Sequence, residues 1–88
     1  MRINHKHQLF HVGQDYFVVD MSNEDVEHAR LYEMNEATAF LWNEFHDVDF
    51  TPNQMVIRLC EVYNVDANIA LHDINQMLET WNEYGMLV

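Results

Sequence analysis

The stretch from Tyr32 to Trp42 constrains the fold most, because a strand-like pattern changes there into a helix-like one. Tyr32 and Met34 alternate with a polar residue, as in a half-buried strand, whereas the apolar residues after Asn35 recur with helical spacing. Asn35 suits the junction because its side-chain oxygen can accept a backbone N–H of the first helical turn, and Glu36 places negative charge at the positive end of the helix dipole. The sequence therefore predicts a strand that runs directly into a helix.

Similar patterns predict the other elements. Runs of aromatic and β-branched residues, separated by turn residues such as Gly13-Gln14-Asp15, predict strands over 7–12, 16–21 and 28–34. N-cap residues before apolar stripes predict helices over 36–46, 52–63 and 67–84, the last of which ends at Gly85. We therefore expect an α+β, winged-helix-like fold, in which a three-stranded antiparallel β-sheet is followed by three α-helices, and a single domain over residues 1–88.

The charge of the chain limits its partners. Fifteen Asp and Glu residues stand against four Lys and Arg, which gives a formal net charge of −11. A nucleic-acid-binding protein gains most of its affinity from Lys and Arg that neutralise phosphates, so this chain should be repelled by a duplex. Neutral or basic polypeptides are the better candidates for partners.

The distribution of cysteine and apolar residues bears on location. Cys60 has no second cysteine with which to form a disulfide within the chain, which suits a reducing compartment. Residues 1–7 have no apolar core of a signal peptide, and no apolar run approaches the roughly 20 residues of a membrane-spanning helix. We expect a cytoplasmic protein with no membrane span.

The residues capable of chemistry give no convincing active site. His5, His7 and His11 fall on one side of an extended segment and could in principle bind zinc or copper, but histidines scattered along a short strand are usually solvated. Cys60 lies on the apolar stripe of the second predicted helix, where core packing is expected. We expect the carboxylate pairs of the predicted loops, such as Asp47 and Asp49, to share no chemical task with a nucleophile or a histidine. We expect no catalytic residue, no metal ligand and no cofactor, and hence not an enzyme.

The predicted sheet has apolar residues on both faces. If Phe17, Val19, Tyr32 and Met34 face the helices, alternation leaves a second apolar set on the other face, namely Leu9, Tyr16, Val18 and Leu31. A second apolar face in water is typical of a contact surface with another chain, although scattered surface apolar residues remain the alternative.

The order and spacing of several short motifs resemble the PqqD-like family. The residues that carry the resemblance are Met34-Asn35-Glu36, Ala37, Ala39, Trp42, Asp47, Thr51, Tyr63-Asn64-Val65-Asp66, Leu78, Trp81, Gly85, Met86 and Leu87. The resemblance covers the chain from about residue 8 to its end. The family often has a Pro-Glu-Gly turn before its third strand and an Asp-Gly pair after its first helix, where this chain has residues 23–27 and Asp47-Val48.

Members of that family serve as recognition elements for ribosomally made, modified peptides. The resemblance therefore implies a non-catalytic module that binds the leader segment of a precursor peptide by strand addition and presents it to a modifying enzyme, typically a radical S-adenosylmethionine (SAM) enzyme. The resemblance also implies that the protein forms dimers and that the leader peptide docks along the edge of strand 28–34. The expected peptide-binding residues are Arg30, Leu31, Tyr32, Glu33, Ala70, Asp73, Ile74 and Met77. The alternative, a winged-helix DNA-binding or regulatory protein, is disfavoured by the charge.

Overall fold

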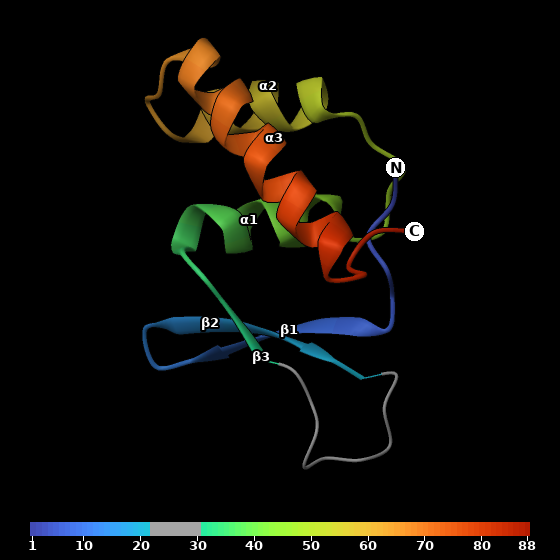
Figure 1. Ribbon diagram of the computed structural model, residues 1–88. Coiled ribbons are helices and arrows are strands. Elements are labelled where there is room, and N and C mark those ends of the chain that lie inside the picture. Colours follow the sequence, from blue (N-terminus) through green and yellow to red (C-terminus); the bar gives the residue numbers. More distant parts are fainter. Residues whose placement is uncertain (22–30) are drawn as a thin grey trace.

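The computed structural model describes residues 1–21 and 31–88. Within these residues the chain forms three strands, β1 (His7–Val12), β2 (Asp15–Asp20) and β3 (Leu31–Met34), followed by three helices, α1 (Glu36–Phe45), α2 (Pro52–Val62) and α3 (Ala67–Glu83). The strands form an antiparallel sheet in the order β1-β2-β3. All of the helices lie on one side of this sheet, with α1 next to it (Figure 1). The α+β fold class expected from the sequence is confirmed.

The element bounds differ slightly from those expected. Each helix begins at the predicted residue and ends one residue earlier. Strand β2 begins at Asp15, so the β1–β2 connection is the two-residue turn Gly13-Gln14. Gly13 has a φ of 62°, which suits the first position of a tight hairpin turn and which side chains disfavour. Positions 28–30 of the predicted third strand lie outside the described residues.

Each helix begins at a side-chain cap. The Oδ1 atom of Asn35 accepts the backbone N–H of Thr38 at 2.8 Å, as the sequence pattern suggested for the strand-to-helix junction. Thr51 and Gln54 form a reciprocal capping box before α2. The carboxylate of Asp66 accepts two backbone N–H groups at the start of α3. These caps fix where the helices start and therefore how β3 is joined to α1.

The register of the sheet corrects the expected orientation of β2. Val18 pairs with Tyr32 and Tyr16 pairs with Met34, and directly paired residues share a face. Val18 is fully buried, so Val18 and Tyr16 face the helices. The expectation that Phe17 and Val19 face the helices was therefore wrong.

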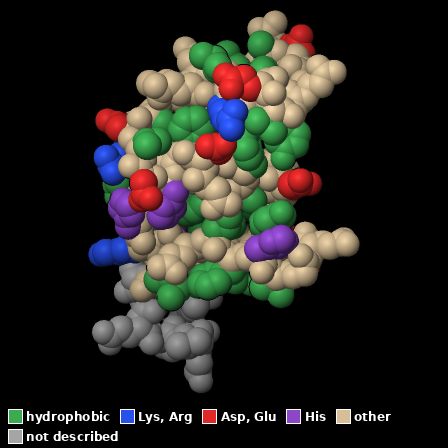
Figure 2. Space-filling view, turned by 180° about the vertical axis from the view of Figure 1, so that it is seen from behind, with side chains coloured by type: hydrophobic (Ala, Val, Ile, Leu, Met, Phe, Trp, Pro, Cys, Tyr) green, Lys and Arg blue, Asp and Glu red, His purple; other side chains and the backbone are tan. Residues whose placement is uncertain are grey.

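Both faces of the sheet carry apolar side chains. The inner face, towards the helices, carries Leu9, Tyr16, Val18, Tyr32 and Met34. The outer face carries Phe10, Val12, Phe17, Val19 and Leu31. A second apolar face is thus present, as expected. Of the four residues expected on it, however, only Leu31 lies there. Figure 2 shows hydrophobic side chains at the sheet end of the molecule.

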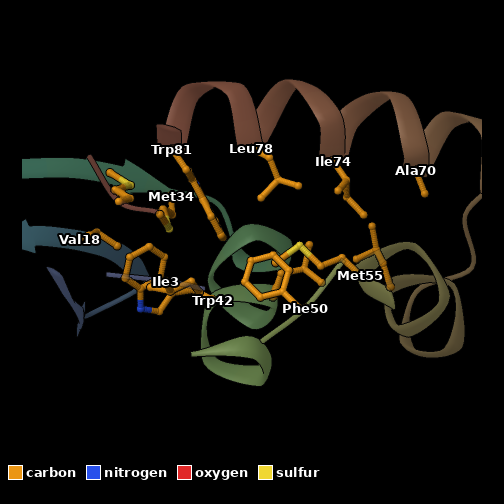
Figure 3. Close-up of a cluster of buried hydrophobic side chains, with 13 residues drawn as sticks. Ile3, Val18, Met34, Trp42, Phe50, Met55, Ala70, Ile74, Leu78 and Trp81 are labelled. Carbon is orange, nitrogen blue, oxygen red and sulfur yellow. The ribbon is translucent and has the colours of Figure 1, made fainter. Parts of the chain in front are cut away.

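The core fills the space between the inner face of the sheet and the helices. Trp42 and Trp81 meet edge to face at its centre, with ring centroids 5.1 Å apart, and Met55 and Ile74 extend the core between α2 and α3 (Figure 3). Ile3 is also fully buried, although the sequence pattern predicted no role in the core for its segment. The side chains that supply most of the core come from the three helices.

The first and last segments of the chain pack together. Ile3 pairs with Leu87 in an isolated antiparallel bridge, and the backbone N–H of Val88 donates to the carbonyl of Arg2 at 2.9 Å. Gly85, at a φ of 74°, ends α3 in the left-handed conformation and redirects the chain towards this bridge. The two ends of the chain lie close together in Figure 1.

The histidines do not behave alike. His7 is 3% exposed, and neither of its ring nitrogens has a hydrogen-bond partner among the described residues. The expectation that the histidines of this segment are solvated is wrong for His7, while His5 and His11 are exposed.

None of the helices in the described part of the chain is long and apolar enough to cross a membrane.

Candidate functional site

Within the described residues, strand β3 forms one edge of the sheet. It pairs with β2, and β2 is occupied on its other side by β1. In a strand, alternate residues direct their backbone N–H and C=O groups to opposite sides, so β3 presents backbone donors and acceptors along the edge away from β2. Such an edge can accept a further strand.

A groove lies beside this edge, between β3 and α3. It has a volume of about 330 Å³. Strand β3 and Asn35 form one side, and Thr38 of α1 and Met86 complete it. The other side is the α3 face formed by Met77, Thr80, Trp81 and Tyr84. The groove therefore places a partly apolar helix face next to the backbone edge.

Two tyrosines from opposite sides of the groove meet in its lining. The rings of Tyr32 from β3 and Tyr84 from the end of α3 have centroids 4.4 Å apart, inclined at 36°. Tyr32 is half-buried, whereas Tyr84 is 42% exposed. Aromatic rings with a polar hydroxyl supply large contact area at interfaces, so this pair offers a ready surface for a partner.

A second hollow adjoins the groove between the helices. It has a volume of about 310 Å³ and shares Asn35, Thr38 and Met77 with the groove. Its walls are largely apolar and come from the three helices, including Leu41, Leu59, Tyr63, Asp73 and Ile74. Met77 stands between the two spaces, where its flexible thioether can adapt to a partner. Through these shared residues, the groove and the second hollow adjoin one another.

The charges around this surface are negative. Glu33 lines the groove and Asp73 lines the second hollow, and both residues are exposed. No Lys or Arg lines either space among the described residues. The surface is therefore suited to a partner segment that is neutral or basic.

The structure brings most of the expected peptide-binding residues together. Leu31, Tyr32 and Glu33 line the groove, and Asp73, Ile74 and Met77 line the second hollow. Ala70 is 2% exposed within the core and lines neither space. Arg30 lies outside the described residues.

Sequence reasoning missed the C-terminal half of the α3 wall. This wall is spaced at intervals of three, one and three residues, so its members share one helix face; they are Met77, Thr80, Trp81 and Tyr84. Extending the expected Asp73–Met77 face by two further turns would have found Thr80 and Tyr84. Trp81 belongs to the core, at 3% exposed, and it also lines the groove.

Comparison with protein families identifies the relatives of this chain. A sequence model of the family described as coenzyme PQQ synthesis protein D (PqqD) matches residues 21–87, which is more than half of the chain. The chain belongs to the PqqD family. The family suggested by the motifs around Asn35 and Gly85 is therefore confirmed.

Comparison of structures places this PqqD-family fold beside a solved complex. The matching structure is described as "TbiB1 in Complex with the TbiA(beta) Leader Peptide", and the match has a TM-score of 0.78 at 15% sequence identity. It covers 99% of this chain and 94% of the other. At this level of identity the likeness shows a shared fold. No curated protein shows a significant match to the chain.

Proposed function

We propose that this PqqD-family protein is a non-catalytic recognition domain that binds the leader segment of a ribosomally made precursor peptide. The observation that carries the proposal is the open β3 edge beside the groove lined by α3. Membership of the PqqD family supports it, as does the fold shared with TbiB1, which was solved with a leader peptide.

The leader adds to the sheet as a further strand beside β3. Backbone hydrogen bonds along the edge supply affinity that depends little on sequence, and side chains on one face of the added strand enter the groove and supply specificity. Tyr32, Met77 and Tyr84 contact these side chains. Leu31 and Glu33 contribute chiefly their backbone, because their side chains point to the outer face of the sheet.

The second hollow extends the contact beyond the strand. Asp73, Ile74 and Met77 receive the part of the leader that continues past the end of β3. Because the carboxylate of Asp73 lines this hollow, the preferred leader carries Lys or Arg in the part that continues past the docking strand.

The domain presents the bound peptide to a modifying enzyme, of the radical SAM type that the family resemblance implies. In this role it needs no cofactor and no catalytic residue of its own. It acts in the cytoplasm, where Cys60 stays a free thiol. The apolar outer face supports self-association into a homodimer, because it would otherwise expose residues such as Phe10 and Leu31 to water.

The proposal is tested with synthetic peptides that cover the leader regions of short open reading frames neighbouring the gene. Calorimetry should detect a peptide that binds the wild-type domain, and Asp73→Lys should weaken binding of a basic leader by roughly 1 to 3 kcal/mol. Glu79→Lys is the matched control, because Glu79 is exposed on the same helix but lines a different hollow. The control should bind like wild type.

A second variant tests the groove itself. Met77→Ala removes the side chain shared by the groove and the second hollow and should also weaken binding. Circular dichroism confirms that each variant is folded. Unchanged affinity in both Asp73→Lys and Met77→Ala would place the peptide site elsewhere.

A further inference from the structure

Three potential metal ligands meet on the flank of the molecule that carries β1, away from the β3 groove. The Nδ1 atoms of His5 and His46 lie 3.7 and 3.3 Å from the Oδ1 atom of Asp47. One ligand atom from each residue can be chosen so that all lie within 4.8 Å of one another. Figure 2 shows histidine and acidic side chains side by side on this flank.

The fold holds these residues together from two distant segments. His46 is the C-cap of α1 and Asp47 follows it, whereas His5 belongs to the N-terminal segment. That segment is fixed by hydrogen bonds on both sides of His5, since Asn4 bonds to Met86 and His7 bonds back to Asn4. The three side chains therefore approach one another because of the fold, and their sequence spacing gave no sign of it.

The spacing fits a small transition-metal ion. Zinc binds imidazole nitrogen and carboxylate oxygen at about 2.0 to 2.2 Å, so neighbouring ligand atoms of a tetrahedral site lie roughly 3.4 Å apart. The two distances to Asp47 are close to this value, at 3.3 and 3.7 Å. A ring nitrogen of His5 and one of His46 lie within 4.8 Å of each other, and His5 is exposed, so rotation of the His5 side chain can bring the third pair of ligand atoms into range.

The surroundings leave room for an ion and its water. A hollow of about 470 Å³ opens at this point, lined by the three residues together with Gln8, Leu9, Trp42 and Asn43. Arg2 is a nearby cation, and it donates to the backbone carbonyl of Asp47 at 3.5 Å. No side-chain ion pair between Arg2 and the Asp47 carboxylate occupies the position that a metal would take.

We propose that His5, His46 and Asp47 form a binding site for a divalent transition-metal ion such as Zn²⁺. The ion is held by two imidazole nitrogens and one carboxylate oxygen, with water in the remaining position. It ties the N-terminal segment to the end of α1. The site is separate from the peptide groove, because β1 and β3 are opposite edges of the sheet.

The test is calorimetry of the metal-free protein with Zn²⁺, in roughly millimolar Mg²⁺ to occupy the acidic surface non-specifically. We expect one Zn²⁺ per chain and a binding constant that falls at least about tenfold in His5→Asn and in His46→Asn. His72→Asn is the matched control, because His72 is exposed on α3 and outside the cluster. Its affinity should equal that of wild type.

Two further readouts belong to the same experiment. Zn²⁺ should raise the thermal unfolding midpoint of wild type and of His72→Asn, and not that of His5→Asn. Ni²⁺ should quench tryptophan fluorescence, since the Trp42 ring centroid is 6.0 Å from that of His46.

Some outcomes would overturn the site. Wild-type protein that shows no saturable Zn²⁺ binding would do so, as would equal Zn²⁺ affinity in wild type, His5→Asn and His46→Asn. A loss in His72→Asn as large as in His5→Asn would also do so, because it would indicate general binding to surface histidines. Because the side chain of His5 is exposed, His5→Asn should fold normally, so a loss of Zn²⁺ affinity in this variant reports on the site.

Discussion

On the inner face of the sheet Val18 is fully buried beneath the helices, whereas Val19, the next residue of the same strand, points to the outer face and keeps part of its surface in water. The two faces are chemically similar, since the outer face also carries Phe10 and Leu31, which are 42% and 60% exposed. What separates them is the cover that the helices provide. An apolar residue in this sheet thus stabilises the fold or offers a contact according to which side of the strand it occupies.

The largest expected difference between the faces is in stability. Val18→Ala should lower the free energy of unfolding by roughly 2 to 3 kcal/mol, because it removes fully buried methyl groups and leaves a cavity. Val19→Ala should cost less than about 1 kcal/mol, since its side chain is only partly covered. Urea unfolding of the two variants measures this difference. The opposite order would restore the orientation of β2 that the sequence suggested.

The next effect concerns the tyrosine pair on the groove side. Tyr84→Ala should weaken binding of a cognate leader peptide by about 1 kcal/mol, because it removes an exposed aromatic ring that stacks on Tyr32 and borders the groove. Fluorescence anisotropy with a labelled peptide is the measurement. Asn82→Ala, on the same helix end but outside the groove, serves as the control. Equal affinities of the two variants would remove Tyr84 from the site.

A smaller effect is expected for the outer face. Phe10→Lys should weaken self-association in sedimentation equilibrium about threefold without lowering the urea midpoint, because a charge would enter an apolar contact. Ile57→Lys replaces an apolar residue that is 60% exposed on α2, away from the sheet, and should leave association unchanged. Even a weak dimer, with a dissociation constant approaching roughly 1 mM, would be partly formed at several hundred micromolar protein. A wild-type protein that stays fully monomeric at that concentration would therefore refute the dimer.

The smallest effect involves the N-terminal segment, which delivers Ile3 to the inner side of the sheet. The Met1 amino group, 2.8 Å from Asp49, lowers the pKa of that carboxyl below its usual value of 3.8. The stability that this ion pair contributes is therefore present above about pH 4 and is lost as the pH falls through the lowered pKa. Acid titration of Asp49→Asn should lack this component. Because both groups are exposed, we expect only a slight change in the unfolding midpoint.

The features that sequence reasoning predicted are local ones. Asn35, Thr51 and Asp66 each cap a helix through groups within three residues, so their roles are written in short stretches of sequence. The β3 edge and the Met77 face of the groove followed from the strand-to-helix junction, helical spacing and the family resemblance.

The features that it missed depend on contacts between distant segments. The orientation of β2 was ambiguous because both of its faces are apolar, and only the pairing of Val18 with Tyr32 decides it. The burial of Ile3 depends on its bridge to Leu87, at the other end of the chain. The approach of His5 to Asp47 likewise requires the folded N-terminal segment.

The bridge between Ile3 and Leu87 has a topological consequence. Because Val88 bonds to Arg2, a linker of a few residues could join the two ends without crossing the groove or the sheet. A chain closed in this way could be opened at the exposed turn Gly13-Gln14, leaving every helix and the connection from β3 to α1 intact. The order of the elements along the chain would change while their arrangement in space stayed the same.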